Sequence, residues 1–278
     1  MRFTSVLVMA IFSVSCTATT RLPKERYRQN VIYANQTKIG DTLNISLKNN
    51  TSSPLRFSFT STNQNYQVFL SKMGTVYLNQ HTDTVIKAIY ITDVLPAISF
   101  KVHFGDDRIA VQKSPIALPF AFDKTYTVVQ GYNGTFSHHD SRSKNAIDFN
   151  LKVGDTVCAA ADGVVVGVVK DYSKNGATEA WTDFANFITI YHPQANLYTQ
   201  YVHLSHNGAL VKVGDTVKKH QPIGTVGLTG FTTHAHLHFN VLKPVANDWE
   251  STAIDFEEGY KGSRLVKGKL VKKPTVPN

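Results

Sequence analysis

Short runs in which apolar and polar residues alternate place the strongest constraint on this fold. Leu43, Ile45 and Leu47 form one such run, and similar runs recur between residues 36 and 108. A period of two residues is typical of strands with one buried face. No long amphipathic pattern follows the first 35 residues. The sequence therefore predicts an all-β protein with few short helices.

The 278 residues suffice for two modest domains. Strands at about ten-residue spacing predict a small β-sandwich over residues 36–110. Pro115 and Pro119 mark a boundary, after which we expect an antiparallel β-sheet domain over 111–260 and a solvated basic tail over 261–278. The sequence Val-Gly-Asp-Thr-Val occurs twice in the second domain, which suggests two similar hairpins in one antiparallel sheet.

The N-terminus has the pattern of an export signal. Residues 1–15 combine Arg2 with an apolar run that is too short to span a bilayer. Cys16 stands where bacterial lipoproteins carry their lipidated cysteine, although Ser13 occupies a position where Leu is usual. We expect an exported protein of the periplasm or cell envelope, anchored through Cys16 to the outer membrane, with residues 16–35 as a tether. Cleaved export without a lipid is the alternative.

Charge and cysteine content exclude several classes. The formal net charge of +9 favours anionic surroundings such as wall polymers. No recognition motif for nucleic acid accompanies that charge, so we expect no nucleic-acid partner. Cys158 lies in an apolar run with nothing nearby to activate it, and no Gly-x-Ser-x-Gly motif is present. A cysteine or serine hydrolase is therefore disfavoured.

Nine of the eleven histidines lie between positions 138 and 238. On a strand, His236 and His238 would share one face, and two imidazoles facing a core need a partner such as a metal. Asp148 is a single carboxylate in an apolar run, and His138 or His139 could add another ligand. Two histidines, one carboxylate and a water form a catalytic zinc pattern.

The proton carrier of such a site is open at this stage. No His-Glu-x-x-His motif occurs, which argues against the common helical zinc peptidases. The histidines left over, His203 and His236, could each take a proton from a metal-bound water or donate one to an oxyanion.

The second domain resembles the lysostaphin/LytM-type zinc metallopeptidases of peptidase family M23, which cut peptide bonds in bacterial peptidoglycan. The resemblance rests on an ordered series of segments. They are residues 130–138, 146–149, 154–157, 160–165, 186–192, 201–204, 214–217, 224–227 and 236–239.

The resemblance implies one Zn²⁺ per chain, held by His138, Asp148 and His238, with His203 and His236 as catalytic histidines. It further implies an exported zinc-dependent endopeptidase that acts on stem or bridge peptides of peptidoglycan. The alternative is a non-catalytic module that binds peptidoglycan or activates other hydrolases, a role marked by missing ligands. A carrier-type hairpin domain, suggested by the repeated Val-Gly-Asp-Thr-Val, ranks below both.

The sequence departs from the family pattern at the first ligand. Many members have the ligand histidine and aspartate four residues apart, but position 144 is Lys in this chain. The histidine must therefore come from a longer loop, and we favour His138 over His139.

Three further positions carry weaker expectations. His234 stands where small residues are usual, and it could cover the site or add a contact. Residues 173–183 form an enlarged loop, in which Trp181 is either a substrate platform or a surface aromatic. His192 matches a recurrent family position, and we expect it to be structural.

Overall fold

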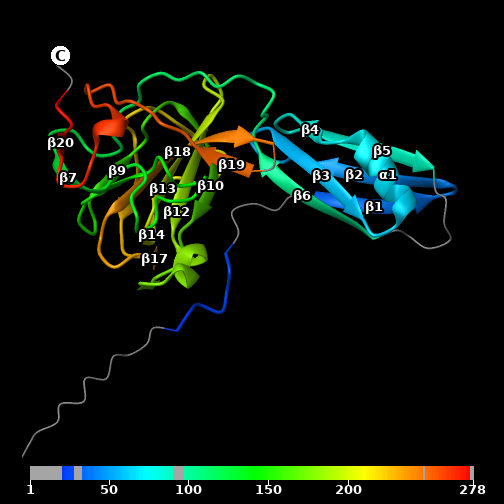
Figure 1. The fold of residues 1–278 in the computed structure, drawn as a ribbon, viewed down its shortest axis with the longest axis horizontal. Helices are drawn as coiled ribbons and strands as arrows, with labels where there is room; N and C mark the ends of the chain where they lie inside the picture. The colour runs from blue at the N-terminus through cyan, green and yellow to red at the C-terminus, as the bar shows by residue number, and fades with distance from the viewer. Residues whose placement is uncertain (1–20, 28–32, 90–96, 247, 276–278) are drawn as a thin grey trace, which may run out of the picture.

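The computed structural model describes residues 21–27, 33–89, 97–246 and 248–275. Two β-rich domains lie side by side along the long axis of the molecule (Figure 1). Almost all strand pairs in these residues are antiparallel and the helices are short, so the predicted all-β class is confirmed. None of the described helices has the length and apolarity needed to cross a membrane. The predicted signal segment and Cys16 lie outside the described residues.

The first domain packs two three-stranded sheets around one core (Figure 1). The first sheet has the order β1-β2-β5, with bounds β1 (Tyr33–Ile39), β2 (Thr42–Lys48) and β5 (Asp83–Ile89). The second has the order β4-β3-β6, with bounds β4 (Val76–Leu78), β3 (Leu55–Ser61) and β6 (Ile98–Phe104). Leu43, Ile45 and Leu47 are buried between the sheets, as their period of two predicts.

The first domain also contains a helix that the alternating pattern does not reveal. Helix α1 (Gln64–Met73) begins after Asn63, whose side chain accepts hydrogen bonds from the backbone amides of Asn65 and Tyr66. Such capping satisfies amides that lack a partner within the helix. Tyr66 and Leu70 then enter the shared core. Two buried residues are too few for the sequence pattern to distinguish a helix from a strand.

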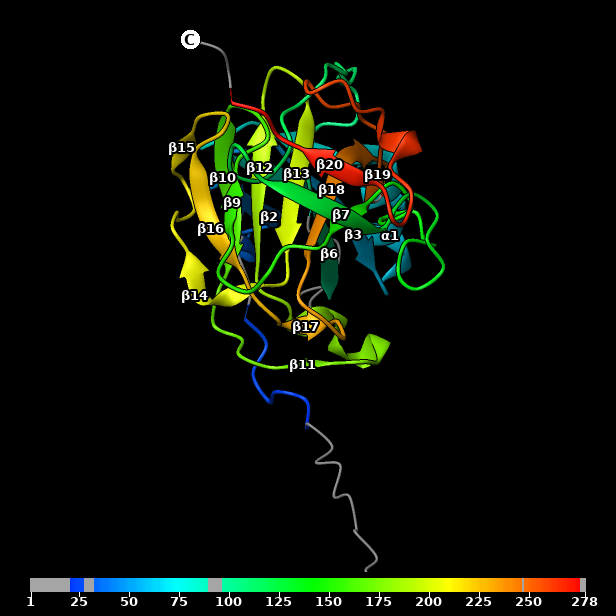
Figure 2. The ribbon, with the colours of Figure 1, turned by 90° about the vertical axis from the view of Figure 1, so that its left-hand side faces the viewer.

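The second domain is built on a nine-stranded sheet (Figure 2). Its order is β15-β10-β12-β13-β18-β8-β7-β20, and β19 pairs with β18. The bounds are β15 (Thr216–Val217), β10 (Gly163–Val169), β12 (Phe187–His192), β13 (Leu197–Val202), β18 (Leu237–Val245), β8 (Ile147–Phe149), β7 (Thr125–Gln130), β20 (Leu270–Lys272) and β19 (Asp248–Ser251).

Smaller elements complete this domain. They are a sheet of β14 (Leu204–Ala209), β16 (Pro222–Val226) and β9 (Thr156–Cys158), a parallel pair of β11 (Asn175–Gly176) and β17 (Gly230–Phe231), and the 3-10 helices η1 (Glu179–Phe184) and η2 (Gly262–Arg264). One face of the large sheet, including Tyr201 and Phe239, packs into the main core. The opposite face carries His238 and, further along, Tyr198.

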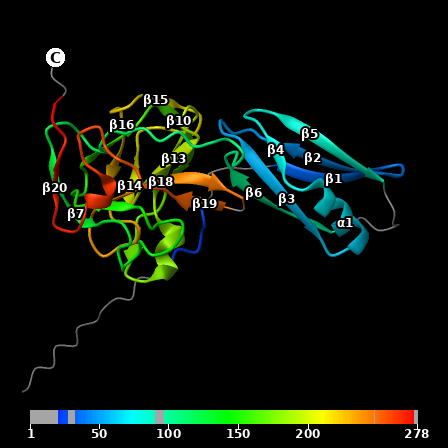
Figure 3. The same cartoon turned by 45° about the horizontal axis from the view of Figure 1, so that its top comes forward.

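The two domains meet on that same opposite face. Phe104 of β6 packs against Tyr198 and Trp249, with ring centroids 6.5 and 5.7 Å apart. The buried Arg56 donates from Nη2 to the backbone oxygen of Asp248 at 3.0 Å. Figure 3 shows the β18–β19 hairpin reaching toward β6. The first domain is therefore docked on one end of the face whose other end carries His238.

The repeated Val-Gly-Asp-Thr-Val segments form matching turns, but the expected pair of hairpins in one sheet is wrong. Asp155 accepts the amide of Lys152 at 2.8 Å, and Asp215 accepts the amide of Lys212 at 2.9 Å. Strand β9 of the first copy then pairs with β16 after the second copy, whereas β15 of the second pairs with β10 after the first. Each copy thus pairs with the strand that follows the other copy, and the two pairs lie in different sheets.

The C-terminal segment is not a solvated tail in residues 261–275. Strand β20 pairs with β7, and Val271 enters the main core. Lys273 is fully buried, and its Nζ donates to the backbone oxygens of Leu118 and Phe120 at 2.7 and 2.8 Å. The charge run misled the prediction because a lysine can bury its stem when its ammonium finds acceptors.

The start of the first domain also differs from the expected boundary. Strand β1 begins at Tyr33, three residues before position 36, because it pairs with β2 along its whole length. Within the expected tether, Arg26 forms an ion pair with Asp183 and the amide of Tyr27 donates to the hydroxyl of Tyr172 at 2.8 Å. Residues 26 and 27 therefore contact the second domain.

Candidate active site

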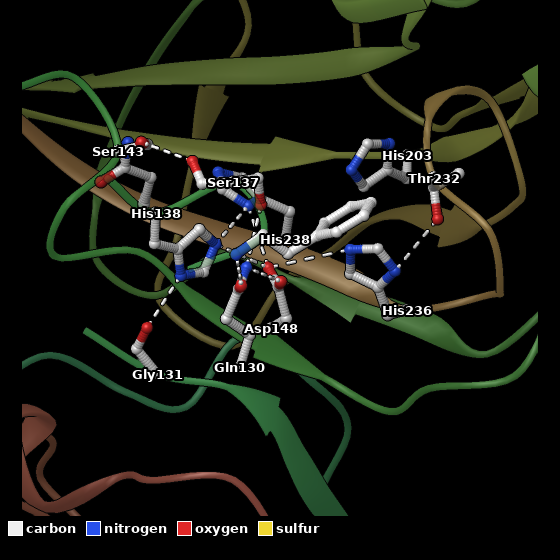
Figure 4. Close-up of polar contacts among 12 residues, drawn as sticks. Gln130, Gly131, Ser137, His138, Ser143, Asp148, His203, Thr232, His236 and His238 are labelled. Atoms are coloured by element: carbon white, nitrogen blue, oxygen red, sulfur yellow. Dashed lines mark hydrogen bonds and ion pairs between the residues drawn. The ribbon is translucent and has the colours of Figure 1, made fainter. Parts of the chain in front are cut away.

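Three of the predicted site residues meet at one point (Figure 4). Asp148 of β8 and His238 of β18 are direct partners in the sheet, so their side chains share a face. His138 reaches them from the loop after β7 and is fully buried. Their ligand atoms all lie within 4.8 Å of one another.

The geometry favours a tetrahedral metal ion. His138 Nε2 lies 3.2 Å from Asp148 Oδ1 and 3.1 Å from His238 Nδ1, and the latter two atoms are 2.9 Å apart. Two ligand atoms that each lie about 2.1 Å from a tetrahedral zinc ion are roughly 3.4 Å apart. The three separations are close to that value.

The protonation pattern points the same way. His138 Nδ1 is bonded to the backbone oxygen of Gly131 at 2.9 Å and must donate its proton there. A neutral His138 then turns the lone pair of Nε2 toward Asp148 and His238. Nε2 of a neutral His138 and Oδ1 of Asp148 are both acceptors, so a proton or a cation must lie between them. The donor set therefore fits Zn²⁺, which binds neutral imidazole and carboxylate.

The electrostatics also favour a cation. Burial raises the pKa of Asp148, but hydrogen bonds with His138 and His238 outweigh this and hold it well below its usual range. Burial opposes a charge on His138, yet its hydrogen bond to Asp148 and the charge of that carboxylate raise its pKa. Asp148 is therefore ionised, and a positive charge beside it is stabilised.

The structure also separates the two neighbouring histidines. His138 is buried in the site, whereas His139 is exposed on the rim. The loop from His138 to Asp148 is held by β19: the amide of Ser251 donates to Ser141 O at 2.8 Å, and Ser251 Oγ accepts the amide of Asn145 at 3.0 Å.

Lys144 does not take the place of a ligand. Its Nζ lies 2.6 Å from Glu250 Oε1 of β19, so its side chain is another tie between this loop and β19. The loop that replaces the shorter family spacing is thus anchored to the hairpin on which the first domain docks.

His203 and His236 flank the three ligand candidates, with ring centroids 4.7 Å apart (Figure 4). His203 Nδ1 donates to the backbone oxygen of Thr229 at 2.7 Å. His236 Nδ1 donates to the backbone oxygen of His234 at 3.0 Å, and its Nε2 lies 3.7 Å from Asp148 Oδ1. With Nδ1 occupied, each ring keeps Nε2 free for proton transfer.

Both rings are held neutral. Burial lowers the pKa of His203 to about 3, and the neighbouring rings of His236 and His238 contribute to this shift. Burial also lowers the pKa of His236, and Asp148 offsets this only in part. His203 has a φ of 65°, which is uncommon for a residue other than glycine. A neutral imidazole is the form that can accept a proton.

Two hollows open beside the site, with volumes of about 540 and 460 Å³. His238 lines the first and Asp148 lines the second. Between them the rings of Phe136 and Phe231 stack, with centroids 4.8 Å apart. A ligand that is longer than one amino acid could therefore extend to both sides of the metal position.

Trp181 is neither a substrate platform nor a surface aromatic. Only 4% of it is exposed, because it packs in a small cluster with Phe184 and Tyr172 beneath η1. The indole also fills the space beside Gly176, where an added Cβ would lie 2.0 Å from Nε1. The enlarged loop thus has its own core, and its neighbours Glu179 and Thr182 line the larger hollow instead.

His192 and His234, the two remaining histidines with a predicted role, have different surroundings. His192 is buried, with Nδ1 2.7 Å from the backbone oxygen of Asp162 and Nε2 2.8 Å from Thr199 Oγ1. Both ring nitrogens have protein partners, which supports the structural interpretation. His234 is exposed beside His236, with ring centroids 5.1 Å apart, and lines the smaller hollow.

Supporting residues were not identified from the sequence. Gln130 contacts Asp148, and Thr229 orients His203 through its backbone oxygen. Gln130 lies in the first segment that resembles the family, but an amide has no metal-ligand signature. A backbone acceptor such as Thr229 O leaves no side-chain pattern to find.

Comparison with known proteins places this domain. The profile of peptidase family M23 matches residues 142–255, a range that contains Asp148, His203, His236 and His238 but not His138. An uncharacterized metalloprotease of Buchnera aphidicola is 31% identical over 145 residues, which cover 51% of this chain and 34% of that protein. The peptidoglycan DD-endopeptidase ShyB of Vibrio cholerae is 32% identical over 165 residues, which cover 53% of this chain and 35% of that protein.

Among solved structures, the catalytic domain of lysostaphin from Staphylococcus simulans is 28% identical and covers 45% of this chain and 84% of that domain, with a TM-score of 0.31. The chain spans about a third of the length of the two relatives above.

An antiparallel sheet with two histidines and one aspartate at a single point, flanked by two neutral histidines, defines a metallopeptidase-type domain. Over residues 142–255 this domain matches peptidase family M23. The resemblance expected from the sequence is confirmed.

Proposed function

We propose that the chain is an exported zinc-dependent endopeptidase that hydrolyses peptide bonds in bacterial peptidoglycan. The observation that carries this proposal is the convergence of His138 Nε2, Asp148 Oδ1 and His238 Nδ1 beside two neutral histidines. The similarity to ShyB, a peptidoglycan DD-endopeptidase, supports peptidoglycan as the substrate and the cell envelope as the location. Lipid anchoring through Cys16 remains part of the proposal.

His138, Asp148 and His238 would hold the zinc ion. When bound, zinc lowers the pKa of a water and polarises a carbonyl. With two neutral imidazoles and one carboxylate, the site keeps about one positive charge, which favours a hydroxide.

His203 and His236 would then move the protons. Their Nδ1 atoms are fixed by Thr229 O and His234 O, so Nε2 of each ring is the atom that accepts a proton and later donates it. General acid–base catalysis of this kind contributes about 10²- to 10⁴-fold to a rate. The two hollows would take the peptide on either side of the cleaved bond.

The test is digestion of purified peptidoglycan by the protein without its first 16 residues, followed by mass spectrometry of the released fragments. The control is His236→Ala, which leaves the three ligand candidates in place. The proposal expects new amino and carboxyl ends with the parent protein only, and the fragments identify the bond. Zinc binding without new peptide ends from any peptidoglycan would contradict it and favour a binding or activating module.

A further inference from the structure

Gln130 contacts Oδ2 of Asp148, the carboxylate oxygen that does not face His138 and His238. It ends strand β7 and is the direct sheet partner of Asp148 on β8. Its Nε2 donates to Asp148 Oδ2 at 3.0 Å and to Ser137 Oγ at 2.8 Å. The two amide hydrogens therefore join the aspartate to the loop that carries His138 (Figure 4).

The orientation of this amide is fixed by a third contact. Gln130 Oε1 accepts the backbone N–H of Phe136 at 3.1 Å. Because a backbone amide can only donate, the oxygen of the side chain must face Phe136 and the nitrogen must face Asp148. A flipped amide would turn its oxygen toward the carboxylate and leave the N–H of Phe136 without this acceptor.

The two oxygens of Asp148 consequently have separate partners. Oδ1 lies 3.2 Å from His138 Nε2 and 2.9 Å from His238 Nδ1. Oδ2 accepts from Gln130. A hydrogen bond to Oδ2 opposes rotation of the carboxylate and opposes binding of an ion through both oxygens, so one coordination position stays open for water.

The chain makes room for this arrangement at Gly134. A Cβ at that position would lie 2.2 Å from Gln130 Cγ and 2.6 Å from Cδ. Any larger residue would push the amide away from Asp148 or displace the loop. The close approach explains why glycine occupies position 134.

We propose that Gln130 is a positioning residue that holds Asp148 as a ligand through one oxygen, with Gly134 providing the space it needs. The proposal rests on the metal site proposed above. It predicts that loss of the Gln130 amide changes the affinity and the coordination of the bound metal ion, in addition to any loss of stability in the loop that carries His138.

The test compares the full chain with Gln130→Met, which keeps the length of the side chain and removes both amide hydrogens. Gly134→Ala is a second variant, which retains Gln130 in the sequence but displaces its side chain. The control is Gln221→Met, at a turn where Oε1 accepts the amide of Lys218 at 2.9 Å, away from the site. Each protein is stripped of metal, and its Zn²⁺ affinity is measured by competition with a coloured chelator. The visible spectrum of each Co²⁺ form is then recorded.

We expect Gln130→Met to weaken Zn²⁺ binding by about 10- to 100-fold, the usual effect of removing a partner of a metal ligand. The Co²⁺ bands should shift at unchanged stoichiometry, and Gly134→Ala should shift them in the same way. The control should match the parent chain. An unchanged affinity and spectrum in Gln130→Met, with only a lower melting temperature of the metal-free protein, would overturn the proposal. A parent chain that binds neither metal would overturn the proposed metal site and this inference with it.

Discussion

The two domains bury polar side chains in different ways. In the first domain, Asn49 donates to the backbone oxygens of Ser53 and Asn79 and accepts from Thr51, so its hydrogen bonds close within neighbouring turns. In the second, His138 Nε2, Asp148 Oδ1 and His238 Nδ1 converge at 2.9 to 3.2 Å from one another. Buried polar groups that satisfy one another locally stabilise a fold, whereas groups that converge without a complete set of donors mark a place for an ion.

The largest expected effect is on kcat, and it distinguishes a histidine beside the proposed metal site from a histidine of the first domain. His203→Ala should lower kcat by about 10²- to 10⁴-fold through loss of a proton carrier, while zinc content stays near one per chain. The matched variant is His103→Ala in β6, which should leave kcat unchanged. Turnover on a cross-linked peptidoglycan fragment measures both. Equal losses in the two variants would remove the distinction between the domains.

Substitution of a buried residue of the second domain that lies outside the proposed metal site should lower stability without lowering zinc affinity. Trp181→Ala removes a buried indole from the cluster beneath η1 and should destabilise the domain by about 3–5 kcal/mol. Zinc affinity should stay within a few-fold of the parent, because the cluster contains no ligand candidate. Urea unfolding and metal titration test the two statements, and a large loss of zinc affinity without loss of stability would contradict the assignment.

A substitution at the contact between the two domains tests whether a buried polar group of the first domain contributes to the stability of the fold. Arg56→Met removes the hydrogen bond to Asp248 O and an ion pair with Asp107 at 3.5 Å. We expect a loss of about 1–3 kcal/mol in the free energy of unfolding, because acceptors at the junction lose a charged donor. Thermal unfolding of the metal-free chain measures it. A more stable variant would show that burying this guanidinium costs more than its contacts return.

The smallest effect concerns the buried C-terminal lysine. Lys273→Met keeps the apolar stem and removes the ammonium that bonds Leu118 O and Phe120 O. The expected loss is about 1–2 kcal/mol, measured by urea unfolding. Lys272→Met, on the exposed neighbour, is the control and should have almost no effect. Similar small changes in both would support the solvated tail expected from the charge run.

The sequence predicts most where chemistry restricts the choice of residue. The alternation of Leu43, Ile45 and Leu47 was enough for the all-β class, and the resemblance to a known family was enough to group His138, Asp148 and His238. Favouring His138 over His139 agrees with the burial of the former, although its role as a ligand stays a prediction.

The sequence predicts least where tertiary partners decide the outcome. Lys273 and Trp181 were misread because burial depends on carbonyls and rings that come from distant parts of the chain. Helix α1 is too short to show a clear period. The role of Gln130 depends on a cross-strand partner and on the space at Gly134, neither of which a local pattern records.

The central claim is that one zinc ion binds where His138, Asp148 and His238 converge. The most direct measurement is a crystal structure of the zinc-loaded chain with anomalous data collected at the zinc absorption edge. The account predicts a single anomalous peak about 2.0–2.2 Å from His138 Nε2, Asp148 Oδ1 and His238 Nδ1. A peak held by His139 or His234 instead, or no peak in these crystals at saturating zinc, would contradict it.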